Sequence, residues 1–383
     1  MPKSITFISL MAGFPWGGSE DLWSKTALLA SKEGFKVKIN LFDWQPRSSE
    51  VNKLLSEKDI SVSFRPLSPS YSITNRILSR VGLHKLGQIK WENYIDANTN
   101  LLVINQGGTY DICWHPDLRE FVEKRKIPFV IISQHNFEFE VIPKEWRQVA
   151  KDFFPLAKKI FFVSKRNKDV AELQTLSQFH NSEVIANPIK FEGIDVMPMP
   201  ELKGGKLKLA HIARLDSNVK GQHFLLKALA SEKLINSNWE LSFVGEGKDE
   251  EFLKELTNYL GLSHKVFFLG KQNVLNVWQD HHVLILPSFS EGTPLTLLEA
   301  MKIGRPCIAT DVGGVTEWLD DKVNGLIINH TENSMVEAIN YFISNTDHLI
   351  EMAIQASNKI NQCYPKSPMK NLLTSLEACI NQK

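Results

Sequence analysis

Short apolar runs alternate with longer amphipathic stretches along almost the whole chain, and this alternation constrains the fold more than any other feature of the sequence. In the first half, strands are predicted at residues 5–10, 35–42, 60–66, 100–105, 128–133, 159–164 and 183–187. In the second half, they are predicted at residues 207–212, 239–245, 265–270, 282–287, 306–310 and 325–329. Strands that alternate with helices in this way predict parallel sheets with helices on both faces.

Length and one irregular segment divide this pattern into two domains. A chain of 383 residues is too long for one compact core, so two domains of roughly 150–200 residues each are expected. The segment KFEGIDVMPMPELKGGK, residues 190–206, has two prolines, three glycines and little periodicity, as a linker does. We therefore predict α/β, doubly wound, Rossmann-like domains over residues 1–189 and 190–364, with a helix over residues 365–383 that crosses back to the first domain. Ligands of such folds bind at the carboxyl ends of the strands, so a cleft between the two sheets is the expected site.

Composition excludes several classes of protein. A net charge of +1 argues against a dedicated nucleic-acid binder, and no apolar run approaches the ~20 residues needed to span a bilayer. The N-terminal stretch MPKSITFISLMAGFPWGG is interpreted as a first strand and a glycine-rich turn rather than as a signal peptide. Four cysteines without metal-ligand or redox spacing fit a reducing cytoplasm, where we expect the protein to act: Cys113, Cys307, Cys363 and Cys379.

The stretch PSFSEGTPLTLLEAM, residues 287–301, carries two carboxylates eight positions apart. It follows a predicted strand, and Thr293 and Pro294 indicate the N-cap and the first turn of a short helix. The free amides and the dipole of such a helix start form an anion site. Glu291 before the helix and Glu299 in its second turn can hold hydroxyl groups on either side of a bound phosphate. Taken alone, the pair also fits a plainer interpretation, in which one carboxylate favours the helix dipole and the other is solvated.

Basic residues and glycine turns follow the neighbouring predicted strands. In RLDSNVKG, Arg214 and Lys220 stand on one loop and suit the two charges of a diphosphate, although alone they also fit an exposed basic loop. In FVGEG, Gly245 and Gly247 follow a strand, where a backbone that approaches a ligand closely needs glycine. The stretch TDVGGVTEWL is another strand and glycine turn that leads into a helix.

Taken in order, these segments resemble glycosyltransferase family 4, the retaining GT-B enzymes. The family pattern of R-L-then-K-G, V-G-x-G, P-S-x-x-E-G-x-P-L-x-x-L-E-A-M, G-x-P-V-I-A-T, G-G and N-G-L stands here as RLDSNVKG, VGEG, PSFSEGTPLTLLEAM, GRPCIAT, GG and NGL. The resemblance covers nearly the whole chain and is densest from residue 207 to residue 329. It implies the GT-B fold, in which two Rossmann-like domains face across a cleft, the first binding the acceptor and the second the nucleotide-sugar donor.

The resemblance also implies roles for residues of the second domain. Glu291 matches the glutamate that binds the transferred sugar, and Glu299 matches the one that holds the ribose hydroxyls. Arg214 and Lys220 match the pair that neutralises the donor diphosphate, although they stand six positions apart where the commonest family spacing is five. The other donor-binding residues implied are Gly245 beside the nucleotide, Gln272 and Asn273 at the base, and the helix opening at Gly292, Thr293, Pro294, Leu295 and Thr296.

In the first domain, the stretch FPWGGSE resembles the family's first glycine loop, which places Gly17 and Gly18 opposite the donor phosphates. His135 in SQHNFE follows a predicted strand and matches a histidine beside the scissile bond, whereas its position alone favours a structural histidine equally. Asn136 stands where the family often has an aspartate. The stretches VSKRNKDV and IANPI match the family's serine-lysine and asparagine segments near the cleft. The catalytic residues implied are therefore His135, Arg214, Lys220 and Glu291.

The reaction that the resemblance implies is attack by the acceptor on the same face as the departing diphosphate, whose oxygen takes the proton. The protein then supplies positioning and charge stabilisation. Cations and helix amides can replace a metal ion, and no Asp-x-Asp stands at a strand end, so we expect no metal and no cofactor. The expected donor is a nucleotide-sugar, with UDP-sugars favoured and GDP-mannose next. The expected acceptor is a glycan or lipid-linked glycan of cell-surface polysaccharide or glycolipid biosynthesis.

The acceptor side has one further candidate partner, a membrane surface. Residues 71–91 combine apolar residues at roughly helical spacing with four basic residues and no acidic one. Such a segment can rest on an anionic membrane at the inner face of the cell. It can equally pack against its own domain.

Three alternatives to a sugar-transfer enzyme follow from the same residues. A nicotinamide-dependent oxidoreductase also uses α/β domains and glycine turns, but the first strand is not followed by a full G-x-G-x-x-G with an acidic residue about twenty positions on. A non-catalytic nucleotide-sugar-binding protein and a sugar-nucleotide epimerase are possible on the same fold. A turnover assay distinguishes the non-catalytic binding protein from an enzyme, because intact site residues alone do not prove activity.

Overall fold

The computed structural model describes residues 2–67, 89–191 and 193–382, and the chain divides into two compact units. Unit 1 comprises Met1–Pro188 and Pro365–Lys383, and unit 2 comprises Ile189–Tyr364. The boundary predicted from the sequence lies between residues 189 and 190, and residues 365–383 were predicted to form a helix that crosses back to the first domain. The predicted amphipathic segment 71–91 lies almost entirely outside the described residues.

Unit 1 is built on a seven-stranded parallel sheet with the strand order β3-β2-β1-β4-β5-β6-β7. The strands are β1 Ser4–Ser9, β2 Lys36–Phe42, β3 Ile60–Arg65, β4 Leu101–Gln106, β5 Phe129–Ser133, β6 Lys159–Phe162 and β7 Ser182–Val184. The central strands are continuous apolar runs because both faces of the sheet are covered. In the middle of the sheet, Phe7 on β1 is in register with Ile39 on β2 and Val103 on β4.

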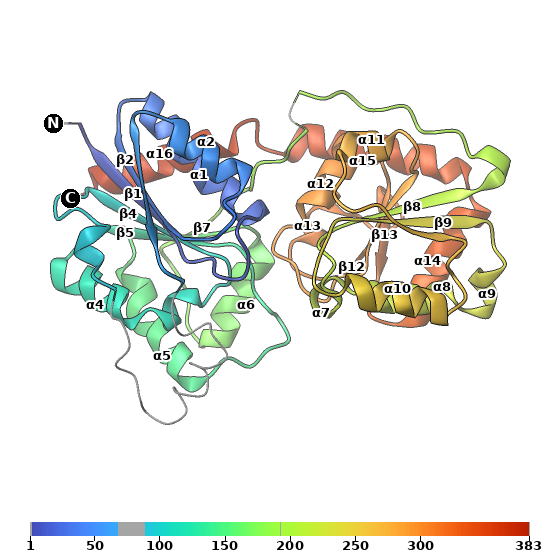
Figure 1. The fold of residues 1–383 in the computed structure, drawn as a ribbon, viewed down its shortest axis with the longest axis horizontal. Coiled ribbons are helices and arrows are strands. Elements are labelled where there is room, and N and C mark those ends of the chain that lie inside the picture. The colour runs from blue at the N-terminus through green and yellow to red at the C-terminus, as the bar shows by residue number, and fades with distance from the viewer. Residues whose placement is uncertain (1, 68–88, 192, 383) are drawn as a thin grey trace. The chain divides into compact units, whose positions relative to one another are not determined.

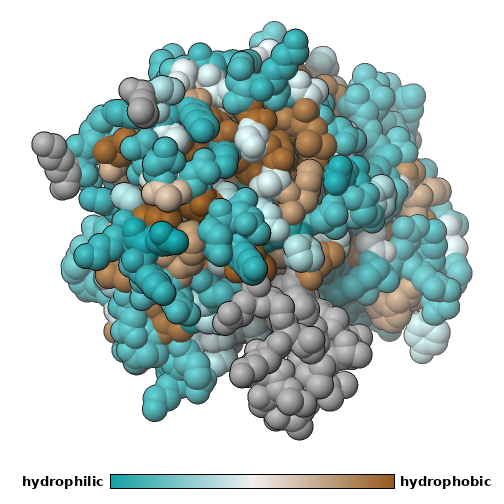
Figure 2. Space-filling view, turned by 60° about the vertical axis from the view of Figure 1, so that its left-hand side comes forward, coloured by the Kyte–Doolittle hydropathy of each residue, from teal (hydrophilic) through white to brown (hydrophobic). Residues whose placement is uncertain are grey.

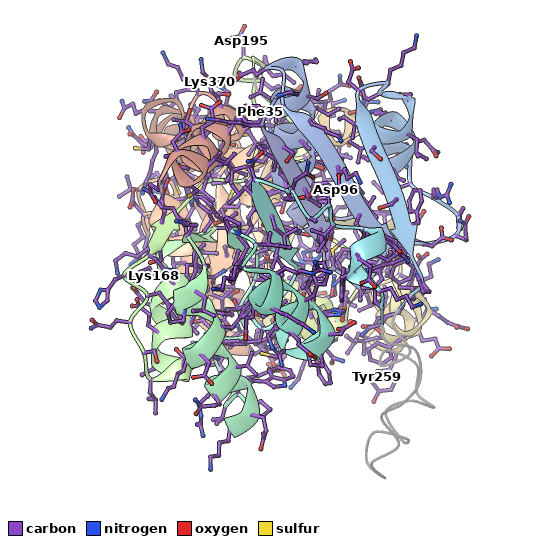
Figure 3. The ribbon with its side chains drawn as sticks, turned by 90° about the vertical axis from the view of Figure 1, so that its left-hand side faces the viewer. Phe35, Asp96, Lys168, Asp195, Tyr259 and Lys370 are labelled. Carbon is purple, nitrogen blue, oxygen red and sulfur yellow. The ribbon has the colours of Figure 1, made fainter. Side chains whose placement is uncertain are left out.

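Helices cover both faces of this sheet (Figure 1). One face packs against α1 Gly18–Lys32, α2 Ser49–Ser56 and α16 Pro368–Asn381, and the other packs against α4 Pro116–Arg125, α5 Lys144–Phe153 and α6 Lys165–Thr175. In α1, for example, Trp23, Ala27 and Ala30 recur at helical spacing and are fully buried. The outer faces stay polar: Lys168 on α6, labelled in Figure 3, forms an ion pair with Glu172 one turn later, at 2.8 Å.

Unit 2 repeats the arrangement with a six-stranded parallel sheet in the order β10-β9-β8-β11-β12-β13. Its strands are β8 Leu207–Ile212, β9 Trp239–Val244, β10 Val266–Phe268, β11 Val283–Leu286, β12 Cys307–Thr310 and β13 Gly325–Ile328. Its helices are α7 Ser217–Lys220, α8 Gln222–Leu229, α9 Glu232–Ile235, α10 Glu250–Tyr259, α11 Val274–Trp278, α12 Leu295–Lys302, α13 Val315–Trp318, α14 Glu332–Ser344 and α15 Asp347–Cys363. Both units are therefore doubly wound, and the fold class predicted from the alternation is confirmed.

The predicted linker is a packed strap on unit 2. Phe191 is 5% exposed and lies in the same apolar cluster as residues of α12, and Met199 packs on the cluster of the opposite face. The fully buried guanidinium of Arg305 holds the strap, because its Nη1 donates to the Met197 carbonyl at 3.0 Å and its Nη2 donates to the Pro198 carbonyl at 2.8 Å. The segment therefore lacks hydrophobic periodicity because it packs irregularly on unit 2, and it is not a flexible linker.

The face of the molecule drawn in Figure 2 is described by its hydropathy. Figure 2 views the molecule after a turn that brings unit 1 forward, and this face is mostly hydrophilic, with apolar residues gathered over part of it. Among the described residues, no helix is both long and apolar enough to cross a bilayer.

Candidate active site

In unit 2, the sequence-predicted residues gather at the carboxyl edge of the sheet. Arg214 follows the end of β8, Lys220 is the last residue of α7, and Glu291 lies between β11 and α12. These elements belong to neighbouring parallel strands, whose carboxyl ends meet at one edge. The folded chain therefore joins two stretches that are 71 positions apart in the sequence, since the Lys220 ammonium and the Glu291 carboxylate are in direct contact.

The contact between Lys220 and Glu291 is short and buried. Lys220 Nζ lies 2.7 Å from Glu291 Oε1, and the two side chains are 20% and 9% exposed. The Ser288 hydroxyl donates to the same carboxylate oxygen at 2.6 Å. A cation and a carboxylate thus lie side by side, and each stabilises the charge of the other.

His211, which was not among the residues singled out from the sequence, is close enough to Lys220 and Glu291 to feel the charge of both. Burial lowers the pKa of His211 to about 4, so the imidazole is neutral near pH 7. Its Nδ1 lies 2.8 Å from the Ile285 carbonyl, which can only accept, and its Nε2 therefore accepts from Gln222 Nε2 at 3.1 Å. A neutral ring keeps a third positive charge away from Lys220. The signal in the sequence was a histidine inside an otherwise apolar strand, LKLAHI.

Arg214 remains accessible at the edge of the sheet. Its side chain is 38% exposed, and Nη2 lies 3.3 Å from Asp216 Oδ2. Asp216 also pairs with Lys248 at 3.2 Å, so one nearly buried carboxylate holds two cations. Asp216, which the sequence analysis did not assign, therefore positions the guanidinium without neutralising the local positive charge.

Helix α12 begins at Leu295, one residue later than predicted, and this changes the assignment of its N-cap residue. Pro294, not Thr293, occupies the N-cap position, and no side chain caps the helix there. The prediction of a threonine cap is wrong, because Pro294 has an extended conformation, with ψ of 102°, and the helix proper starts at Leu295 and Thr296. Thr293 is itself 8% exposed and stands just outside the helix.

Glu299 is buried and not a solvated surface residue. Its side chain lies in the second turn of α12 and is 4% exposed. Oε1 accepts a hydrogen bond from the backbone amide of Lys190 at 3.2 Å. The plainer interpretation of Glu299 from the sequence is therefore excluded, while its proposed contact with a ribose stays a prediction.

The glycines of these loops allow neighbouring backbone segments to pack closely, because a side chain at these positions would clash. A Cβ on Gly245 would lie 2.2 Å from the Ala213 carbonyl oxygen, and Gly245 has a φ of +141°. Likewise, a Cβ on Gly221 would lie 2.0 Å from the Pro287 carbonyl oxygen. Gly292 is also part of this packing between loops, since its carbonyl accepts a hydrogen bond from the Gly314 amide at 2.7 Å. In the structure, the group next to Gly245 is thus the neighbouring loop of the protein, and the close approach of a ligand to Gly245 stays a prediction.

The loop assigned to the nucleobase is partly engaged in its own structure. Asn273 caps α11, since its side-chain oxygen accepts from the Leu275 amide at 3.0 Å. Gln272 donates to the Leu269 carbonyl at 2.7 Å and is exposed. Both side chains are held at the edge of the sheet, and their contact with a base stays a prediction.

In unit 1, the predicted residues lie at the carboxyl edge of the other sheet. Gly17 is the N-cap of α1 and Gly18 its first residue. His135 follows β5, and its ring packs edge-on against Phe137 with centroids 4.5 Å apart. The His135 carbonyl accepts from the Thr109 amide at 2.8 Å and from the Thr109 hydroxyl at 2.9 Å.

Behind the glycine loop and the histidine runs a chain of buried polar side chains that sequence reasoning missed. Asn105 Nδ2 donates to Glu20 Oε1 at 2.8 Å, and Gln134 Nε2 donates to Asn105 Oδ1 at 3.3 Å. Asn187 Nδ2 donates to Gln134 Oε1 at 2.7 Å. The chain of hydrogen bonds therefore links the first turn of α1 to the residue before His135 and to Asn187, next to the end of the first segment of unit 1 at Pro188. Its members are far apart in the sequence, and none of them carries a local signal that connects it to the others.

The two parallel α/β units, each with its polar residues at the carboxyl edge of its sheet, have the GT-B fold. Solved structures agree over the whole length. A structure of Anabaena HepE in complex with UDP and glucose has a TM-score of 0.72 at 19% identity and covers 98% of this chain and 100% of that one. The lipopolysaccharide outer core galactosyltransferase WaaB has a TM-score of 0.68 at 19% identity over 98% of this chain and 99% of that one.

Sequence comparison finds a family match in the second unit. Residues 197–359 match the family described as Glycosyl transferases group 1. An uncharacterized glycosyltransferase of Haemophilus influenzae is 31% identical over 137 residues, which are 35% of this chain and 39% of the relative. The lipopolysaccharide 1,6-galactosyltransferase of Escherichia coli is 29% identical over 181 residues, 45% of this chain and 49% of the relative. The aligned segments thus span at most half of these two relatives.

Proposed function

We propose that this chain is a retaining glycosyltransferase that moves a hexose-type sugar from a nucleotide-sugar to a hydroxyl group of a glycan or lipid-linked glycan. The observation that carries the proposal is the pairing of Lys220 with Glu291 beside Arg214, at the edge of a group 1 glycosyltransferase domain. A diphosphate needs cations, and a sugar needs a carboxylate acceptor for its hydroxyl groups. The cation Lys220 and the carboxylate Glu291 lie within hydrogen-bond distance of each other, at 2.7 Å.

In the proposed mechanism, the acceptor attacks the anomeric carbon on the face from which the diphosphate leaves. The leaving oxygen takes the proton of the attacking hydroxyl, so no protein nucleophile is required. Arg214 and Lys220 stabilise the charge that develops on the phosphates, and Glu291 orients the sugar. Because two cations and the start of α12 supply this stabilisation, we propose that the enzyme needs no metal ion.

Printed names of similar proteins support a choice of donor and acceptor. HepE has been solved with UDP and glucose, and the galactosyltransferase relatives act on lipopolysaccharide. A Campylobacter jejuni relative, 27% identical over 202 residues, is named as an N-acetylgalactosaminyltransferase for an undecaprenol-linked glycan. We therefore propose a UDP-sugar as donor, with GDP-mannose as second choice, and a cell-surface polysaccharide or glycolipid as product. A cytoplasmic location and contact of residues 71–91 with a membrane surface are parts of the same proposal.

The deciding experiment is a panel of UDP-, GDP- and ADP-sugars, scored by thermal shift and by slow hydrolysis of the donor with and without EDTA. We expect stabilisation by UDP-sugars, release of UDP that EDTA does not change, and a released sugar that keeps its anomeric configuration in early NMR spectra. Stabilisation without any turnover, with all acceptors tried, would instead identify a nucleotide-sugar-binding protein. Interconversion of the free sugar-nucleotide would identify an epimerase.

A further inference from the structure

Two consecutive backbone amides at the start of unit 2 are held by side chains that come from distant parts of the chain. Ile189 is the first residue of this unit, and its amide donates to the Tyr364 hydroxyl at 3.0 Å. The next amide, that of Lys190, donates to Glu299 Oε1 at 3.2 Å. Tyr364 and Glu299 are therefore connected through two neighbouring residues of the backbone.

Tyr364 is itself fixed in its position. It is the C-cap residue of α15, with φ of −75° and ψ of 132°, and its amide donates to the Ile360 carbonyl at 3.0 Å. Its ring packs on the apolar cluster that includes residues of α12, and its centroid lies 6.0 Å from that of the Trp318 ring. Because α12 and α15 also pack side by side (Figure 1), the Tyr364 hydroxyl has a defined position relative to Glu299.

The backbone that joins these two side chains is also packed. Ile189 is 3% exposed and Phe191 is 5% exposed, and both lie in the apolar cluster that includes residues of α12. Apolar packing holds the side chains of this stretch but does not fix how a peptide group is turned, because it is non-directional. A hydrogen bond is directional, so the Tyr364 hydroxyl fixes the peptide at Ile189 and, with it, the direction of the Lys190 amide.

The Lys190 amide in turn orients the Glu299 carboxylate. The last torsion of a glutamate side chain is broad, so the plane of its carboxylate turns easily until a donor fixes it. Glu299 is 4% exposed, and its hydrogen bond to a backbone amide selects one plane. The two hydroxyl groups of a ribose need such a fixed plane, because both must donate to the carboxylate with good geometry at once. Ribose binding at Glu299 would therefore depend on the direction of the Lys190 amide.

We infer that Tyr364 is a positioning residue for the nucleotide half of the donor. Its hydroxyl holds the backbone at Ile189 and Lys190, and this backbone orients Glu299 for the ribose hydroxyl groups. The inference rests on the proposed function, because it takes Glu299 as the carboxylate that holds the ribose. It deepens that function by adding a residue that acts on donor binding through the backbone.

A hydrogen bond with a purely structural role would have a different signature. If Tyr364 only stabilised the end of α15, its loss would change the affinity for all nucleotides alike, or for none. If Tyr364 positions Glu299, the loss is confined to ligands with ribose hydroxyl groups, because these are the groups that donate to the carboxylate. The two cases are separated by UDP and 2′,3′-dideoxy-UDP, which differ in these hydroxyl groups alone.

The test is isothermal titration of the full chain with UDP and 2′,3′-dideoxy-UDP, or with the matching guanosine pair if the donor panel selects guanine. Tyr364→Phe removes the hydroxyl and keeps the ring. We expect it to weaken UDP binding about three- to tenfold, which corresponds to one lost hydrogen bond, and to leave dideoxy-UDP binding unchanged. KM for the UDP-sugar should rise by the same factor at unchanged kcat, since the ribose is remote from the reacting atoms. The matched control is Tyr341→Phe, which removes a hydroxyl group bonded to His348 in the same unit and should change neither affinity.

Hydrogen exchange gives a second readout that needs no ligand. Residues 186–191 should lose protection in Tyr364→Phe and keep it in Tyr341→Phe. The inference is overturned if this protection is unchanged in Tyr364→Phe, or if that variant weakens UDP and dideoxy-UDP binding by the same factor or weakens neither.

The wild-type protein separates this inference from the proposed function. If it transfers or hydrolyses the UDP-sugar but binds UDP and dideoxy-UDP equally, Glu299 does not hold the ribose, and the inference fails while the transferase stands. If it neither binds nor hydrolyses any donor, the proposed function itself has failed and the inference with it.

Discussion

The ion pair between Lys220 and Glu291 gives the sharpest prediction, because the two residues are proposed to serve different parts of one substrate. Without donor, each neutralises the other at 2.7 Å. A bound diphosphate must compete with Glu291 for the Lys220 ammonium. Removal of the Glu291 charge by Glu291→Gln should therefore leave the affinity for UDP unchanged or raise it, while transfer of the sugar falls sharply.

The magnitudes follow from the geometry of the pair. At 2.7 Å and an effective dielectric constant of about 20, the attraction is roughly 6 kcal/mol before desolvation is counted. Desolvation offsets much of this, and removal of one partner of a buried pair typically costs about 3–5 kcal/mol. We expect Lys220→Met to lower the free energy of unfolding by about 3 kcal/mol. Glu291→Gln should cost only about 1 kcal/mol, since the amide oxygen still accepts from the Ser288 hydroxyl.

Two assays read the two consequences. Urea unfolding of the single variants and the double variant gives the coupling between Lys220 and Glu291, and isothermal titration with UDP gives the affinity. Lys220→Met should weaken UDP binding by about 1.5–3 kcal/mol, the range for hydrogen bonds to charged groups. Glu332→Gln is a matched control, because Glu332 forms an exposed pair with Lys227 in the same unit. A Glu291→Gln variant that loses as much UDP affinity as Lys220→Met would refute the competition between carboxylate and diphosphate.

Three further predictions concern the scaffold. Arg305→Met should lower the free energy of unfolding by about 3 kcal/mol or more, because the buried guanidinium donates to carbonyl groups of the strap and of neighbouring loops; limited proteolysis should then cleave residues 190–206 first. Gly221→Ala should destabilise the fold, since the new Cβ would meet the Pro287 carbonyl, whereas Gly13→Ala, with open space around it, should be nearly neutral in thermal unfolding. Burial raises the pKa of Asp111 to about 7, above its ordinary value near 4. The folded state therefore binds more protons than the unfolded state in this interval, and the contribution of Asp111 to stability is lost as the pH rises from about 4 to 7. Asp111→Asn should reduce the fall in unfolding free energy between pH 5 and pH 8, and an unchanged slope would contradict the assignment.

Several site residues could be found from the sequence because their signals are local. Strand ends are marked by the switch from an apolar run to glycine and polar residues, as at Gly245 and at the stretch before Glu291. Since parallel strands end at one edge, residues that follow such runs are expected to lie close together. The fold class and the placement of Arg214, Lys220 and Glu291 at one edge follow from this reasoning, and the close contact of Lys220 with Glu291 agrees with that placement. Their roles were assigned from the family resemblance and stay predictions.

Other features could not be found because they depend on contacts between distant segments. The capping residue of α12 was assigned from residue preferences, yet the packing of the preceding loop decides it, with Pro294 at the N-cap and Thr293 outside the helix. The burial of Glu299 depends on the strap that reaches over α12 at Lys190, more than a hundred positions earlier in the sequence.

The sequence by itself determined that the chain forms two parallel α/β units with basic and acidic residues at strand ends, since short-range hydrophobic periodicity and motif spacing carry that information. Only the tertiary structure decided which polar residues meet. Glu20, Asn105, Gln134 and Asn187 form one buried chain of hydrogen bonds across unit 1, and Lys220 meets Glu291 across 71 positions of sequence. The physical reason is that a hydrogen bond or a pocket wall depends on positions in space, and sheet order and register bring residues together that no local pattern connects.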